Sequence, residues 1–355
     1  MKEVLTRWYQ RYLSEEEAVI LLVMMAVAFG VMLFFGDILA PVLVAVILAY
    51  LMQGVANVLR QRGLPGELSV AVSTLLFLSG FFAVLLGLAP LVWRQLVALV
   101  RETPAIIEAW RVVLVTLPEE YPVFFTQQQV NELTAVIQAE MASVGQLIVT
   151  KGLSSIPSVL AAIVYLILIP LMVFFFLKDR EQLTGWFASF LPTKRPLLER
   201  IWSELNLQFA NYARGKGIEV LIIGCASYVV FAMFSLNYAA LLALLVGFSV
   251  IVPYIGAALV TIPVVVVAYF QFGVTPDFYW VVGAYLLIQV LDGNVLVPLL
   301  FSEAVNLHPV AIVISVLFFG GLWGLWGVFF AIPLATLVNA ILTAWPSSDL
   351  PAVSS

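Results

Sequence analysis

The sequence predicts an all-α, polytopic membrane protein with about eight spans. Hydrophobic residues make up 63% of the 355 residues and charged residues only 10%, and the mean hydropathy is +1.09. A soluble domain does not have this composition, because its surface must be polar and solvated. Several apolar stretches also reach the roughly 20 residues that a helix needs to cross a hydrocarbon core of about 30 Å.

Five apolar stretches are long enough to be spans: residues 18–35, 38–59, 68–92, 153–177 and 218–236. Lysine and arginine gather in the amino-terminal arm, in the turn after the second stretch and in the segment 178–216. Because cytoplasmic loops carry an excess of these residues, all three places are assigned to the cytoplasm. The amino terminus is then predicted to be cytoplasmic. The carboxyl terminus is predicted to be cytoplasmic as well, because the number of crossings returns it to that side whether the two later interrupted segments cross or turn back.

The insert between the third and fourth spans, residues 93–152, is more polar than its neighbours. Apolar residues recur in it at helical spacing: Val130, Leu133, Ile137, Met141, Val144 and Ile148. This stripe predicts a small amphipathic helix outside the cytoplasm, and Pro104, Pro118 and Pro122 predict that the earlier part is divided into shorter pieces. We expect the stripe to pack on its neighbours or on the membrane surface; a partner-binding lid is the alternative.

A second polar segment, the connector 178–217, is predicted to be cytoplasmic. Its apolar residues also share one helical face: Leu198, Ile201, Leu205, Phe209 and Tyr212. The stripe starts just after Pro196, where helices commonly begin. We expect an amphipathic helix along the inner membrane surface, with its basic flank facing anionic lipid headgroups.

Two apolar stretches in the carboxyl-terminal half, residues 238–272 and 309–342, are interrupted near their middle. The interrupting residues are Pro253, Tyr254 and Gly256 in the first and Gly320, Gly321, Gly324 and Gly327 in the second. Both stretches resume with an Ile-Pro pair, and each follows a single span. An internal repeat, 218–272 and 278–342, is therefore predicted, and each broken segment either crosses the membrane or forms a hairpin.

Paired broken segments in matching positions indicate a transporter's binding site, because unwound backbone offers carbonyl groups and half-helix ends to a solute. Such backbone is stable at membrane depth only where protein encloses it or water reaches it. The alternative is helix packing, since small residues also mark close helix contacts.

The predicted organisation follows from these segments. It comprises an amino-terminal three-span region (1–92), the extracytoplasmic insert (93–152), a fourth span (153–177), the cytoplasmic connector (178–217), a transport core (218–345) and a cytoplasmic tail (346–355).

The last 139 residues contain no lysine or arginine but do contain acidic residues. Acidic side chains inside a membrane segment without cationic partners indicate a pathway for something polar. Asp292 is the strongest candidate, because Gln289 and Asn294 place further oxygen atoms near it. Low dielectric favours a protonated carboxyl group, which suits proton or small-cation exchange; the alternative is a turn with a helix cap. Glu219 and Glu303, near predicted span ends where water solvates them, are weaker candidates.

The remaining polar residues predict no metal site, cofactor or nucleic-acid partner. Cys225 is the single cysteine and His308 the single histidine, which excludes a disulfide within the chain and a cysteine metal cluster. His308 precedes a proline and is expected to begin a helix. The cations form no basic patch interleaved with aromatic residues, and no nucleotide-binding motif or set of catalytic groups is present.

Four stretches carry a resemblance to a known family: PLMVFFFLKDRE (170–181), YARGKGIEVLIIG (212–224), IVPYIG (251–256) and, after DGNVLVP (292–298), NLHPVAIVISVLFFGGLWGLWGVFFAIP (306–333). In order and spacing the chain resembles the autoinducer-2 exporter-like family. The resemblance implies a homo-oligomeric protein of the bacterial inner membrane with about eight spans. Some members are linked to export of the furanone autoinducer-2, and others are similar to sodium or lithium/proton antiporters.

The family's motif positions fall on Pro253 and Gly256, on Asn294 and Pro298, and on the stretch 320–327. The sequence therefore predicts a secondary transporter of a small polar solute rather than an enzyme, with Asp292 holding the coupling ion and the two breaks forming the gate. A sodium or lithium/proton antiporter is the second interpretation. A non-transporting scaffold that recruits envelope proteins is the third.

Overall fold

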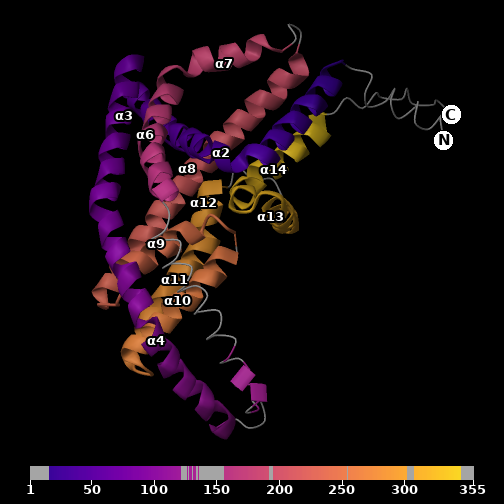
Figure 1. Ribbon diagram of the computed structural model, residues 1–355. Helices are drawn as coiled ribbons and strands as arrows, with labels where there is room; N and C mark the ends of the chain where they lie inside the picture. The colour runs from indigo at the N-terminus through magenta and orange to yellow at the C-terminus, as the bar shows by residue number, and fades with distance from the viewer. Residues whose placement is uncertain are drawn as a thin grey trace, which may run out of the picture.

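The computed structural model describes residues 16–120, 126, 128, 129, 131, 132, 135, 156–191, 195–253, 255–301 and 308–344. Helices are the regular structure of these residues, which confirms the all-α prediction (Figure 1). Their bounds are α2 Glu16–Gln61, α3 Gly66–Ala83, η1 Val84–Leu88, α4 Ala89–Glu120, α6 Ile156–Lys178, α7 Arg180–Ser189, α8 Pro196–Met233, α9 Ala239–Ser249, α10 Ile255–Phe272, α11 Pro276–Leu291, η2 Asp292–Leu296, α12 Val297–Phe301, α13 Pro309–Trp323 and α14 Leu325–Ala344; η1 and η2 are π-helical turns.

Within the described part of the chain, 5 helical stretches are long and apolar enough to cross a membrane. They are Ile38–Gln61, Gly66–Ile106, Leu198–Met233, Ile255–Phe272 and Pro276–Phe301. Helices α6 and α7 meet at 80° and give a sixth if they are counted as one broken span. The chain is thus a polytopic membrane protein, and the count of eight stays a prediction.

Three predicted interruptions are helical in the structure. Helix α2 runs without a break from the first apolar stretch into the second, and α8 joins the connector stripe to the span that follows it. Helix α4 continues past Pro104 and Pro118, so the expected division of this segment is wrong. A single proline removes one backbone hydrogen bond and bends a helix, but it does not end one whose other residues favour it.

Helices α3 and α4, joined through η1, form one long rod that extends beyond the rest of the molecule (Figure 1). The rod contains the start of the predicted insert. Pro122 and the predicted stripe from Val130 to Ile148 lie outside the described residues.

The stripe on α8 faces protein rather than the membrane surface. Leu198 and Ile201 are buried against Leu21 of α2, and Leu337 of α14 packs beside them. Tyr212, farther along the same face, is 2% exposed. The predicted apolar face is therefore confirmed. It packs against other helices rather than lipid, because α8 continues directly into the core.

The largest buried cluster lies where α8, α9, α10 and α11 meet. Its fully buried members include Phe231, Leu242, Val264 and Tyr285. The Tyr285 hydroxyl is also 2.8 Å from the Thr261 hydroxyl of α10. This cluster fixes the helices on both sides of the first break.

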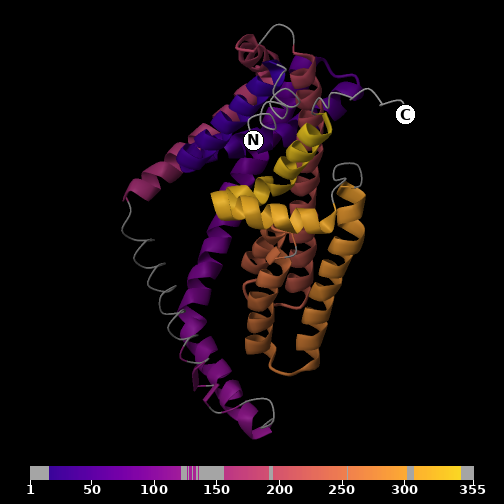
Figure 2. The same cartoon turned by 90° about the vertical axis from the view of Figure 1, so that its right-hand side faces the viewer.

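Both predicted breaks are present in the structure. Helix α9 ends at Ser249 and α10 begins at Ile255, while α13 ends at Trp323 and α14 begins at Leu325. The 11 residues of α9 and the 15 of α13 give lengths of roughly 16 and 22 Å at 1.5 Å per residue, too short for a hydrocarbon core of about 30 Å. Figure 2 shows α13 and α14 (yellow) as a V-shaped pair.

Candidate functional site

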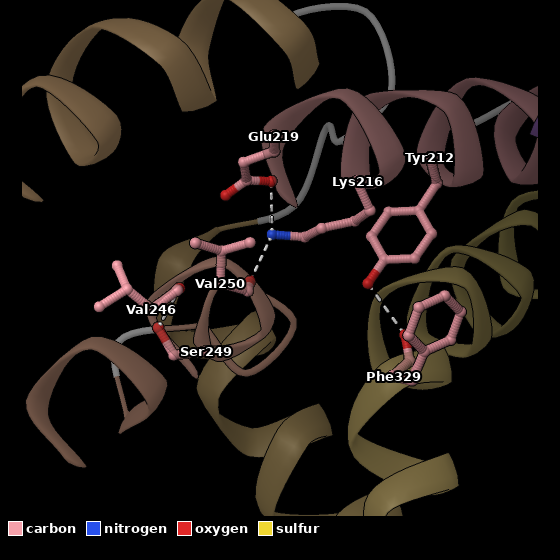
Figure 3. Close-up of polar contacts among 7 residues, drawn as sticks. All are labelled: Tyr212, Lys216, Glu219, Val246, Ser249, Val250 and Phe329. Atoms are coloured by element: carbon pink, nitrogen blue, oxygen red, sulfur yellow. Dashed lines mark hydrogen bonds and ion pairs between the residues drawn. The ribbon is translucent and has the colours of Figure 1, made fainter. Parts of the chain in front are cut away.

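Helix α8 passes both broken segments and donates a hydrogen bond to a backbone carbonyl group of each. At the first break, the Lys216 ammonium group donates to the carbonyl oxygen of Val250 at 2.7 Å (Figure 3). The same Nζ atom is 2.8 Å from Oε2 of Glu219 and 5.1 Å from the centre of the Phe301 ring. Lys216 is 6% exposed and Glu219 1%, so the ion pair is enclosed by protein.

The position of Lys216 follows from the end of α9. The last carbonyl groups of a helix have no partner within the helix, and they carry partial negative charge. A lysine ammonium group suits such an end because it donates hydrogen bonds and brings the opposite charge. Lys216 therefore stabilises the backbone where α9 unwinds.

In the second broken segment, Tyr212 satisfies a carbonyl group within α14, beyond the break. Its hydroxyl group donates to the carbonyl oxygen of Phe329 at 2.9 Å (Figure 3). Phe329 lies four residues before Pro333 of α14, and proline has no N–H to give to the carbonyl at that spacing. The Tyr212 hydroxyl replaces the missing donor.

Tyr212 and Lys216 are four residues apart, so they project from the same face of α8. One rigid helix thus links the backbone of both broken segments.

Two glycines allow the breaks to close tightly. A Cβ atom at Gly256 would overlap the backbone carbonyl of Ser249, and one at Gly327 would overlap the carbonyl of Phe319. In each case the start of the second half-helix lies against the end of the first. Gly324, which ends α13, has a φ of +58°, a conformation that glycine adopts more readily than other residues. The two close contacts and the positive φ explain why glycine occupies three of the predicted gate positions, 256, 324 and 327.

Asp292 begins the π-helical turn η2 within the span that starts at Pro276. It is 9% exposed and interacts electrostatically with both Lys216 and Glu219. Among the described residues its Oδ1 atom has no hydrogen-bond partner. The structure therefore brings two predicted acids, Asp292 and Glu219, to the same buried place beside the first break.

Two expectations about charge are wrong. Glu219 is not solvated at a span end, because α8 continues on both sides of it and buries it. It also has a cationic partner, Lys216, the residue just before the cation-free part of the chain. Lys216 in turn is a core residue rather than a cation of a surface loop.

Other predicted residues lie apart from this cluster. The Asn294 side chain is exposed and donates to the Val290 carbonyl oxygen at 2.8 Å, and Pro298 is exposed on α12. Gln289 is half-buried. Tyr254 and Glu303 lie outside the described residues.

His308 caps the start of α13, where its Nδ1 atom accepts a hydrogen bond from the N–H group of Val310 at 3.3 Å. This confirms the expectation that it begins a helix.

Residues of α2 and residues on both sides of the second break line a groove of about 240 Å³. Aromatic residues of both elements line it, namely Phe34 of α2 and Trp323, Trp326 and Phe330 around the break. Gly320 and Gly321 lie on the last turn of α13, where a Cβ atom at Gly320 would come within 2.8 Å of the Val328 side chain and one at Gly321 would meet nothing. Gly320 therefore packs against Val328 of α14, while Gly321 faces open space.

The sequence reasoning missed Lys216 and Tyr212. A signal for both exists in the sequence. Lys216 precedes Glu219 by three residues, a spacing at which helical side chains pair, and Tyr212 is one helical turn before Lys216. The prediction of a cytoplasmic connector for residues 178–217 places both side chains outside the membrane core, so it does not use this signal.

Comparison with known proteins gives the family. The pattern described as "AI-2E family transporter" matches residues 22–347. The chain belongs to the AI-2E family of transporters. It is 44% identical over 350 residues to the Escherichia coli protein named "Putative permease PerM", covering 99% of each chain. It is also similar to the Bacillus subtilis protein named "Putative transport protein YueF", with 25% identity over 314 residues, 86% of this chain and 84% of the relative.

Membership of the AI-2E family confirms the predicted resemblance and agrees with the membrane spans of the described residues. The matched range includes α8, both breaks and Asp292.

Proposed function

We propose that the protein is a secondary transporter that moves a small polar solute through a pathway between the two broken segments. One observation carries the proposal: in both broken segments, which are apolar, a side chain of α8 supplies the donor for a backbone carbonyl group, at the end of α9 in the first and four residues before Pro333 of α14 in the second. A backbone carbonyl that loses its helical donor, at an unwound turn or before a proline, is stable in a membrane only where protein or water satisfies it. A bundle of unbroken helices without internal prolines would not need side-chain donors for its backbone carbonyl groups.

In this proposal Asp292 holds the coupling ion. Its carboxyl group is buried, and its neighbours Lys216 and Glu219 already form a pair. An intramembrane carboxylate without its own partner is suited to bind and release a proton or a small cation. Gly256, Gly324 and Gly327 form the gate, with Pro253, Tyr254, Gly320 and Gly321 beside it; Gln289, Asn294, Pro298, Glu303 and Glu219 belong to the wider pathway.

The proposed setting is the bacterial inner membrane, with both termini in the cytoplasm and the chain assembled as a homo-oligomer. The proposed solute is an autoinducer-2-like furanone, the class after which the family is named. Exchange of sodium or lithium for protons is the second candidate, because a buried carboxylate next to an ion pair also suits a monovalent cation.

Flux measurements test the proposal. In proteoliposomes with an imposed proton gradient, the wild-type protein is expected to move autoinducer-2 or, on addition of sodium or lithium, to restore the fluorescence of a trapped pH dye. Asp292→Asn should reduce this flux at least ~100-fold, since loss of an essential exchangeable group removes the coupled step. An unchanged pH-dependent flux in that variant would remove Asp292 from the mechanism.

The scaffold interpretation makes the opposite prediction for the same vesicles. It requires that neither the furanone nor a cation moves faster through wild-type vesicles than through vesicles without protein.

A further inference from the structure

The buried charges beside the first break do not balance. Lys216 contributes one positive charge, and Glu219 and Asp292 contribute two negative charges. The chain from residue 217 to its end has no lysine or arginine that could supply another cation. Arg214, one turn before the cluster, already donates to Ala210 and Asn211. Among the described residues, Lys216 is the cation that acts on both carboxyl groups, so the cluster is one positive charge short when both are ionised.

The contacts of Lys216 hold its ammonium group against the Glu219 carboxylate. Its Nζ atom lies 2.8 Å from the Glu219 carboxylate and donates to the Val250 carbonyl at 2.7 Å. Its neighbour Gly215 allows the Phe301 ring to lie close, because a Cβ atom there would come within 2.6 Å of that ring. The ammonium group is thus held between α8, α9 and α12. The carboxylate it leaves uncompensated is that of Asp292.

Burying an unpaired charge is costly, so a bound positive ion at Asp292 stabilises the folded state. With Lys216 in place, one positive charge is enough for neutrality. We propose that Lys216 is the specificity-determining residue of this site, since it neutralises Glu219 and so restricts Asp292 to a single positive charge. This inference rests on the proposed function only in taking Asp292 as the ion-binding group.

The proposal has a direct consequence for ion valence. Without Lys216, the cluster has two uncompensated carboxylates and the free carbonyl of Val250. Carboxylate and carbonyl oxygens are the ligands that calcium prefers, and two negative charges match its charge. Removing the lysine should convert a site for one positive charge into a site for a divalent cation.

Thermal unfolding of the detergent-solubilised protein tests this without any flux measurement. Calcium chloride is compared with choline chloride at equal ionic strength. For Lys216→Gln we expect calcium to raise the Tm by roughly 3 °C or more, as a ligand that binds only the folded state does. For the wild-type protein we expect no calcium effect. Arg200→Gln is the matched control, because Arg200 is an exposed cation on the same helix.

Two double variants separate charge from residue identity. Lys216→Gln with Glu219→Gln restores one negative charge and should lose the calcium effect, and Lys216→Gln with Asp292→Asn should lose it as well. If Lys216→Gln is too unstable to purify without calcium, we expect folded protein to be recovered only when calcium is present during solubilisation. A calcium response equal to that of wild type, or loss of the variant with and without calcium, overturns the proposal. Failure of flux with a positive calcium response would instead overturn the proposed transport function.

Discussion

Replacing Gly256 or Gly327 by alanine is expected to destabilise the protein by about 3 kcal/mol and to abolish transport. At both positions a Cβ atom would overlap a backbone carbonyl, of Ser249 and Phe319 respectively. A backbone atom cannot move aside as a side chain can, so the half-helices must separate and the packing around the break is lost. Unfolding of the detergent-solubilised variants and flux in proteoliposomes measure the two effects.

Gly283→Ala is the matched control for these variants. Gly283 lies within helix α11, where a Cβ atom would meet nothing within 4 Å. Alanine there should leave stability unchanged or raise it by about 0.5–1 kcal/mol, because alanine favours helix more than glycine does. If all three variants behaved alike, the close approach at the breaks would have no energetic importance.

Replacing Lys216 by glutamine, with calcium removed by a chelator, is expected to cost about 3–5 kcal/mol of unfolding free energy. The substitution leaves the Glu219 carboxylate buried without its partner and removes the donor of the Val250 carbonyl. A buried charge that loses its partner is far more costly than an absent pair.

A double-mutant cycle with Glu219→Gln isolates the interaction free energy between Lys216 and Glu219. Because the double variant contains no unpaired lysine or glutamate, its cost should be at least ~2 kcal/mol smaller than the sum of the two single costs. Additive costs would mean that the two side chains do not stabilise each other in the membrane.

The breaks were predictable because the residues that cause them are rare inside apolar helices. Pro253 lacks a backbone donor, and the glycines of the second break permit a positive φ at Gly324. Both effects depend on single residues and not on their neighbours in space, so the sequence alone indicates them. The same local argument was wrong for Pro104 and Pro118, where α4 continues.

The charge cluster was not predictable in the same way, because it depends on which helix passes the breaks. Gly217, which reads as a weak point in a helix, lies where a Cβ atom would overlap Leu51 of α2. Packing against α2 therefore explains the glycine, and α8 remains continuous through it. Only with α8 continuous do Tyr212 and Lys216 face the two broken segments.

The most direct test of the account asks whether water reaches the breaks from both sides of the membrane. Single cysteines are placed at Val252 and at Leu325 in a Cys225→Ser background, since Cys225 is itself exposed. The comparison position is Leu259 on α10, which is 62% exposed, similar to Leu325 at 69%. A charged, membrane-impermeant thiol reagent is added to right-side-out or to inside-out vesicles, and it modifies a cysteine only where water allows the thiolate to form.

The account predicts that the cysteines at 252 and 325 react in both kinds of vesicle, because a transport pathway opens alternately to each side, and that the cysteine at 259 reacts in neither. Protection of the two break positions in both kinds of vesicle, or reaction from one side alone, would contradict it.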